Sequence, residues 1–327
     1  MGKASQRESS TELLRIISMI MIMGLHSFSV EAMTTTTNVP VEFFRESMAI
    51  CSVNVFVLIS GFYSIKWKTK SFFLFIFQIY FYSLIIYILA LCLGITEFEK
   101  SQFFSRIIYP FGNWWFVESY LLLYIVSPFL NKIYQNSSIW VTAVLIVFLY
   151  GTIAFGLNFK NILLFSVIYM IGRIMNTYKC LFQKINRNSY LIIFLLLTVI
   201  ITFLTIVYFK NGAYSNKMLQ HYIWGFNYKN PLVILQAISL FLYVTSYSYY
   251  NKAINKVAVS AFAVYLIHMH PDVKDMYYNF AKELYHFNDY THYFIMMIFI
   301  AFVFMFCVLI DQVRLYSFSK INCFVKK

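Results

Sequence analysis

Residues 12–28, ELLRIISMIMIMGLHSF, form an apolar stretch after Glu12 that contains one arginine, Arg15, and one histidine, His26. Its length and composition predict a helix that crosses a membrane. The two side chains are 11 positions apart, which at about 100° per residue places them on one helix face, roughly 16 Å apart along the axis. Ionisable groups are costly in hydrocarbon and usually face a protein interior or a wet cavity. The pair therefore indicates a functional face.

The composition of the whole chain is that of an integral membrane protein. Of its 327 residues, 61% are hydrophobic and 12% are charged, whereas about 25% are charged in a typical soluble domain. We expect an all-α, polytopic membrane helical bundle of about ten transmembrane helices, forming a single domain over residues 1–327. The expected spans are 12–30, 47–65, 71–94, 113–131, 139–157, 161–176, 190–209, 231–249, 257–271 and 291–311, and the sixth and ninth are short enough to be tilted, re-entrant or broken.

The basic residues give these spans a direction. When the spans alternate, most of the 26 lysines and arginines fall on one side, and cytoplasmic loops are enriched in these residues. With an even number of spans, both termini are predicted to be cytoplasmic in a multi-pass protein of the cell membrane. This topology explains most of the net charge of +13, which is spread over short loops, so nucleic acid is not an expected partner.

Cysteines and prolines are distributed as in a helical bundle without cross-links. The cysteines are odd in number and contain no Cys-x-x-Cys pair, so neither a disulfide framework nor a metal site is expected. The prolines are expected in loops or near the ends of spans. The residues concerned are Cys51, Cys92, Cys180, Cys307 and Cys323, and Pro40, Pro110, Pro128, Pro231 and Pro271.

The remaining ionisable residues of the spans lie towards the outer side. Span direction places Arg15 near the cytoplasmic end and His26 in the outer half, with Glu118 at a similar depth. His268 and His270 lie near the outer end of the ninth span. A cytosolic anionic donor such as acyl-CoA would meet positive charge at the inner end, while a deeper histidine serves as general base or transient acyl acceptor. On depth alone, Glu118 is the candidate for fixing the tautomer of His26.

Each of these residues also has a purely structural interpretation. Arg15 taken alone is typical of a cation that returns its charge to the head groups. His26 alone is typical of a hydrogen bond between helices, and Glu118 of the interface. His268 and His270 alone are typical of polar groups near a loop. Their joint placement favours function.

The motif Arg15-x10-His26 on the first span resembles the signature of the membrane acyltransferase 3 family. Three later segments are similar to family segments in the same order. They are VNVFVLISGFYSI at 53–65, followed by a basic loop, NWWFVESYLLLYIVSPFLNKI at 113–133, and VYLIHMHP at 264–271. The basic loop carries lysines where the family often has arginines, and Tyr120 occupies the position at which some branches place a glutamate.

The resemblance implies transfer of an acyl group, usually acetyl from acetyl-CoA, to a hydroxyl of a capsule, exopolysaccharide or lipid-linked sugar. This activity is O-acetylation in polysaccharide biosynthesis. The implied partners are acyl-CoA as co-substrate, a glycan or glycolipid acceptor and the lipid bilayer, with no bound cofactor. Carried over, His26 is catalytic and Arg15 is its basic partner. We assign the other residues as follows: Glu118 is catalytic, Lys66, Lys68 and Lys70 bind the donor with Arg15, and Trp115, Tyr265 and His268 bind substrate.

Two other classes of function fit the same residues. In a transporter or flippase for a lipid-linked glycan, Arg15, His26 and Glu118 would line a translocation path. A non-catalytic assembly subunit would neither transport nor consume acyl-CoA. Consumption of acyl-CoA separates the enzyme from both.

Replacing Arg15 with Ala is expected to weaken use of the acyl-CoA donor, because the variant lacks the cation nearest the cytosolic end of the first span. The KM for acyl-CoA should rise about tenfold, as for loss of one charged hydrogen bond, in steady-state assays of the purified protein. Lys132→Ala, which removes another cation on the same predicted side, serves as the control. Unchanged donor affinity and turnover in Arg15→Ala would remove the role assigned to Arg15.

Overall fold

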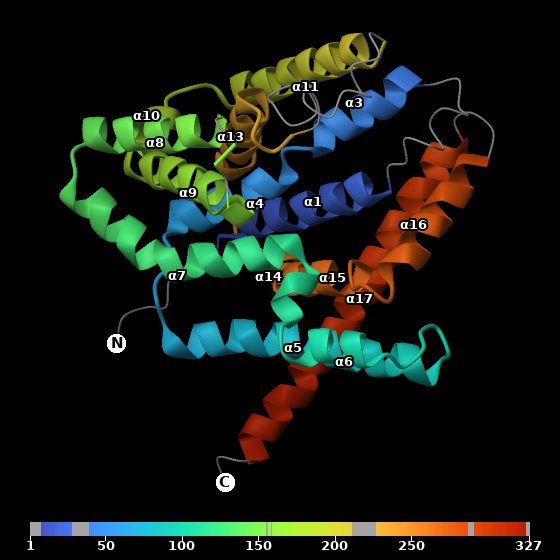
Figure 1. Cartoon of the computed structure of the whole chain (residues 1–327). Helices are drawn as coiled ribbons and strands as arrows, with labels where there is room; N and C mark the ends of the chain where they lie inside the picture. Colours follow the sequence, from blue (N-terminus) through green and yellow to red (C-terminus); the bar gives the residue numbers. More distant parts are fainter. Residues whose placement is uncertain are drawn as a thin grey trace. The chain divides into compact units, whose positions relative to one another are not determined.

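The described part of the chain is helical. The computed structural model describes residues 8–27, 39–154, 156–157, 159–210, 227–286 and 291–324, and within these ranges the backbone forms helices and no strands (Figure 1). The predicted all-α class is confirmed. The chain divides into two compact units, each assembled from separate stretches of sequence.

The first unit consists of Met1–Thr37, Phe72–Trp114 and Tyr250–Lys327. In it, α1 packs against α14, α15 and α17. Its helices are α1 (Ser9–His26), most of α5 (Thr69–Cys92), α6 (Lys100–Ile107), η1 (Pro110–Asn113), α14 (Lys252–Ala258), α15 (Ala261–His268), α16 (Lys274–Glu283), η4 (Leu284–His286) and α17 (Thr291–Phe324).

The second unit consists of Asn38–Ser71 and Trp115–Tyr249. Within it, α9 packs against α4, α7 and α8, while α13 packs against α4 and α11. Its helices are α3 (Val39–Ala49), α4 (Ser52–Tyr63), α7 (Trp115–Asn136), α8 (Ile139–Ala154), η2 (Phe159–Asn161), α9 (Ile162–Thr177), α10 (Lys179–Phe182), α11 (Arg187–Lys210) and α13 (Pro231–Thr245).

Seven apolar helices coincide with predicted spans. Four are long and apolar enough to cross a membrane, and three are shorter. A span of roughly 30 Å of hydrocarbon needs about 20 residues, fewer when neighbouring protein or a thinner bilayer covers the ends. The total of ten spans therefore stays a prediction. The long helices are Pro40–Tyr63, Thr69–Cys92, Arg187–Val207 and Thr291–Ser319, and the shorter ones are Ile139–Ile153, Ile162–Thr177 and Pro231–Thr245.

Several predicted boundaries differ from the structure. The stretches 95–112 and 272–290, expected as loops, contain α6 and α16, and α3 begins at Val39 inside another expected loop. The ninth predicted span, 257–271, is divided between α14 and α15. The start of α14 lies earlier than predicted because the Asn251 side chain caps it, accepting hydrogen bonds from the next turn's N–H groups at 2.9 and 3.1 Å.

Pro128 lies inside α7. It was expected near the end of a span, because the predicted span ended at residue 131. Proline has no N–H, so the carbonyl of Tyr124, four residues earlier, loses its helical donor. The hydroxyl of Ser127 donates to that carbonyl at 2.8 Å. This hydrogen bond replaces the missing one, and the helix continues to Asn136.

Two glycines allow α4 and α9 to pack closely within the second unit. A Cβ atom at Gly61 would lie 2.2 Å from the carbonyl oxygen of Tyr169, and one at Gly172 would lie 2.6 Å from that of Leu58. Both distances are far below van der Waals contact. The two backbones touch here because neither position carries a side chain.

Substituting Gly61 with Ala is expected to destabilise the second unit, because the added methyl group collides with a backbone carbonyl that cannot turn away. Overpacking of this kind costs about 1–3 kcal/mol. Thermal unfolding of the detergent-solubilised protein should show a lower Tm. Gly151→Ala is the matched control, since nothing lies within 4 Å of its Cβ position. An equal Tm for both variants would contradict the close packing of α4 and α9.

Candidate active site

Arg15 and His26 lie on one continuous helix, as their spacing predicted. Helix α1 runs from Ser9 to His26, so His26 is its last residue. The Arg15 guanidinium forms an ion pair with Glu12, whose side chain is only 6% exposed. Arg15 itself is 32% exposed. One partly exposed cation thus marks the first half of the helix, and one imidazole marks its end.

His26 contacts His268, the last residue of α15. The Nδ1 atom of His26 and the Nε2 atom of His268 are 3.0 Å apart, within hydrogen-bond distance. His268 is fully buried, whereas His26 is half-buried. Two of the predicted site residues, which are 242 positions apart in the chain, are therefore brought together.

The partner of His268 on its other side determines where the protons lie. The Nδ1 atom of His268 is 2.6 Å from the carbonyl oxygen of Val264. A carbonyl only accepts, so Nδ1 of His268 carries the proton, and Nε2 of the neutral ring is an acceptor. Nδ1–H of His26 must then donate to His268. This leaves the lone pair of His26 on Nε2, the nitrogen that a general base or nucleophile uses.

Aromatic side chains surround the histidine pair. The ring of Tyr265 lies 6.5 Å from that of His26 and 6.1 Å from that of His268. The Tyr278 ring presents its edge to His26 at 6.4 Å. Tyr265 is buried and one turn before His268 on α15. The predicted substrate residue Tyr265 is thus a neighbour of both imidazoles.

Two tyrosine hydroxyls hold the end of α1 that carries His26. Tyr277 of α16 donates to the carbonyl of Met23 at 2.8 Å, and Tyr285 of η4 donates to that of Ser27 at 3.4 Å. The ring of Tyr277 also lies 5.5 Å from that of His268. The segment that follows α15 therefore contacts both halves of the pair.

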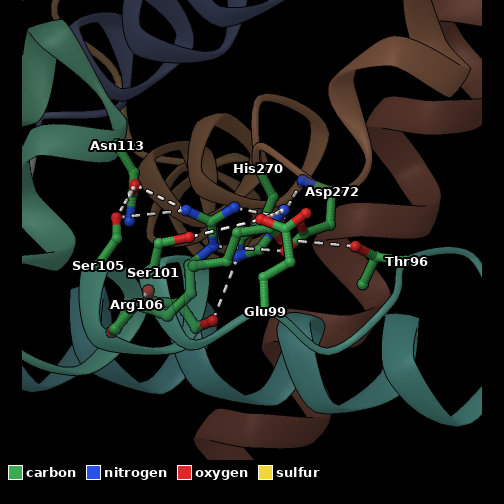
Figure 2. A network of polar contacts seen from close by, with 10 residues as sticks. Thr96, Glu99, Ser101, Ser105, Arg106, Asn113, His270 and Asp272 are labelled. Carbon is green, nitrogen blue, oxygen red and sulfur yellow. Dashed lines mark hydrogen bonds and ion pairs between the residues drawn. The ribbon is translucent and has the colours of Figure 1, made fainter.

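A second polar network lies at the same end of α15 (Figure 2). Arg106 of α6 grips Asp272 with two nitrogens, Nη2 at 3.1 Å from Oδ1 and Nε at 3.4 Å from Oδ2. Its Nη1 atom donates to Asn113 at 2.9 Å. The side chains of Arg106 and Asp272 are only 8% and 6% exposed. Removing one partner of such a buried pair typically costs about 3–5 kcal/mol.

His270 belongs to this second network. Its Nε2 atom lies 3.2 Å from the carbonyl of Ser83, and its Nδ1 atom lies 3.3 Å from both the backbone nitrogen and Oδ2 of Asp272. The rings of Trp114 and His270 pack edge to face, with centroids 5.7 Å apart. Both nitrogens of His270 are therefore engaged, as are both nitrogens of His268. Among these three histidines, only His26 has a nitrogen without a partner in the described residues.

Arg106 and Asp272 were not among the predicted site residues. Asp272 directly follows the His-Met-His-Pro stretch, so an acid beside two histidines was a readable signal. Arg106 is one of several cations outside the spans, and nothing in the sequence singles it out. Within the described part of the chain, no group of three or more His, Cys, Asp or Glu residues could hold a metal ion.

The predicted donor-binding lysines lie in the second unit. Lys66, Lys68 and Lys70 are all exposed; Lys66 and Lys68 follow the end of α4, whereas Lys70 lies in the first turn of α5. Asn131 of α7 donates to the carbonyl of Ile65 at 3.0 Å. The start of the basic loop is thus fixed while its lysines face outward.

Trp115 and Glu118 lie in the first turn of α7, also in the second unit. Trp115 stacks on Tyr228 with ring centroids 5.5 Å apart. His26 belongs to the first unit. The pairing of Glu118 with His26 therefore stays a prediction.

Comparison with known proteins gives a family. A family model described as an acyltransferase domain matches residues 9–310, which is most of the chain. No curated protein and no solved structure matches it.

The partners of the histidines predict their reactivity towards diethyl pyrocarbonate, whose carbonyl carbon is attacked by an unprotonated imidazole nitrogen. His26 should be carbethoxylated faster than His268 and His270, because both nitrogens of the latter two are engaged and their rings are buried. Mass spectrometry of peptides from the folded protein would measure the rates, with His286, whose side chain is 72% exposed, as the positive control. Equal labelling of all three histidines would contradict this arrangement.

Proposed function

Since the chain belongs to the acyltransferase 3 family, whose model spans residues 9–310, we propose that it is an acyl-CoA-dependent O-acyltransferase that acts on a glycan. The membrane acyltransferase activity follows from the family. The proposed donor is acetyl-CoA, and the proposed acceptor is a hydroxyl of a cell-surface or exported glycan. The observation that carries the proposal is the state of the His26 ring: His268 holds it through Nδ1, and its Nε2 has no partner among the described residues.

In the proposed reaction, Nε2 of His26 takes the proton of the acceptor hydroxyl as its oxygen attacks the thioester carbonyl. A carbon–oxygen bond forms, and the carbon–sulfur bond breaks. The proton then passes from His26 to the leaving sulfur, which departs as the thiol of CoA. A stepwise route, in which Nε2 first accepts the acyl group, uses the same lone pair.

His268 supports this step by orienting the base. Its Nε2 atom accepts from Nδ1–H of His26, which keeps the lone pair on the reacting nitrogen and faces the positive charge that develops on the ring. This is the role of the acid in a Ser-His-Asp triad. In the proposed site, His268 takes the role first predicted for Glu118.

The proposed donor side lies at the cytoplasmic end. The rise from Arg15 to His26, roughly 16 Å, matches the extended pantetheine arm of CoA, so the thioester can approach His26 while the phosphates stay near the cytosol. Lys66, Lys68 and Lys70 of the second unit stay predicted residues for binding the donor phosphates. Because lysine is a flexible point charge, we expect them to contribute attraction rather than bidentate recognition.

The acceptor is proposed to contact aromatic side chains. Tyr265 lies beside both imidazoles, and Trp115 is 38% exposed. Aromatic rings combine an apolar face with a polar edge, which suits a sugar ring. We therefore propose that Tyr265 binds the acceptor, while Trp115 of the second unit stays a predicted acceptor residue.

Replacing His26 with Ala is expected to lower the rate of acyl transfer by about 10²–10⁴-fold, the usual contribution of a general base. Acyl-glycan formation and release of free CoA would be measured together on purified protein. His286→Ala, which alters an exposed histidine, is the control and should keep full activity.

The same assay separates the alternative functions. Substrate movement without release of CoA would indicate a transporter or flippase, and neither activity would indicate an assembly subunit. Full acyl transfer by a folded His26→Ala variant would overturn the proposed mechanism.

A further inference from the structure

The end of α15 is held by two contacts that the proposed reaction does not use. His268 is the last residue of this helix, and only three residues separate it from Asp272. The ion pair with Arg106 ties Asp272 to α6, and the carbonyl of Ser83 ties His270 to α5. The backbone just beyond the catalytic pair is thus anchored to two other helices.

A helix as short as α15 depends on such anchors. It has eight residues, and isolated helices shorter than about 12 residues are marginal. Its orientation is therefore set by its packing and by what holds its ends. The hydrogen bond of His268 to His26 tolerates displacements of only about 0.5 Å before its geometry is lost.

The turn after α15 is held by backbone hydrogen bonds, so the position of Asp272 affects that of His268. The carbonyl of His270 accepts from the backbone nitrogens of Val273 and Lys274 at 2.9 and 2.8 Å, and the nitrogen of His270 donates to Ile267 at 3.2 Å. This turn leads directly into α16, whose Tyr277 holds α1 near His26. One anchored segment therefore positions both histidines.

We propose that Arg106 and Asp272 are positioning residues for acyl transfer, which act by holding His268 against His26. The inference rests on the proposed function of His26. The side chains of Arg106 and Asp272 are almost fully buried and bound to each other, so they act on the reaction through the backbone of the α15 turn rather than on a substrate.

The first test uses polar variants that remove the charge of one partner of the Arg106–Asp272 ion pair. Arg106→Gln and Asp272→Asn should each lower kcat by roughly 10- to 100-fold, the scale of loss known for residues that orient metal-binding histidines from outside the site. The KM for acyl-CoA should not change. Arg106→Lys keeps the charge but loses the two-nitrogen grip, so it should recover part of kcat and provides a milder variant if Arg106→Gln folds poorly.

The second test asks whether Arg106 acts through His268. In a double-mutant cycle, residues that act through one contact are not additive. Arg106→Gln or Arg106→Lys should therefore lower kcat much less in a His268→Leu background than in the native protein. Arg314→Gln is the matched control: it breaks a buried ion pair with Asp311, 2.8 Å long, in the same unit. Its effect on kcat should be the same factor in both backgrounds.

The outcomes separate the inference from the proposed function. If His26→Ala is inactive and the Arg106 substitutions reduce kcat by the same factor in both backgrounds, the positioning role is overturned while the function stands. If folded His26→Ala is fully active, the function itself fails. A loss of kcat that is smaller in the His268→Leu background for the Arg106 substitutions, but not for Arg314→Gln, supports the positioning role.

Discussion

The hydrogen bond between His26 and His268 is the contact on which the proposed chemistry depends, and it joins residues 242 positions apart. It forms because α1 packs against α14, α15 and α17 in one unit. Tyrosine hydroxyls from the following segment hold the end of α1. A buried imidazole needs partners for both nitrogens, and His268 finds them in the Val264 carbonyl and in His26. Helix packing and the need of His268 for two hydrogen-bond partners therefore favour the same contact between His26 and His268.

Features of the site that depend only on residue spacing within one helix could be predicted from the sequence. The spacing of Arg15 and His26 places both on α1, and composition alone indicates an all-α membrane protein. The contact between His26 and His268 could not be predicted, since periodicity describes faces of single helices and not which faces meet. The importance of Arg106 was hidden for the same reason, because its partner Asp272 comes 166 positions later. The loop helices α6 and α16 were missed because they are too short and polar to appear as spans.

The division of roles among the histidines follows from their acceptors and donors. Three imidazoles and one carboxylate were expected at similar depth, and depth alone ranks none of them. In the structure, one nitrogen of His268 contacts a backbone carbonyl and the other contacts His26. One nitrogen of His270 likewise contacts a backbone carbonyl, and the other contacts Asp272. Of these three histidines, only His26 keeps a nitrogen without a partner in the described residues. Counting partners thus supports the role that the motif already predicted for His26.

A neutral histidine in the supporting role also has a physical advantage over a carboxylate. An ionised carboxylate buried beside a neutral imidazole would lack a compensating charge until the ring is protonated, and burying an unpaired charge is costly. Neutral His268 carries no such cost in the resting state, and its Nε2 still accepts from Nδ1–H of His26 when positive charge develops. In the described structure the one buried carboxylate near this end of α15, Asp272, is paired with Arg106. At this end of α15 the carboxylate charge thus lies in the Arg106–Asp272 ion pair, and the proposed proton exchange with substrate falls to His26.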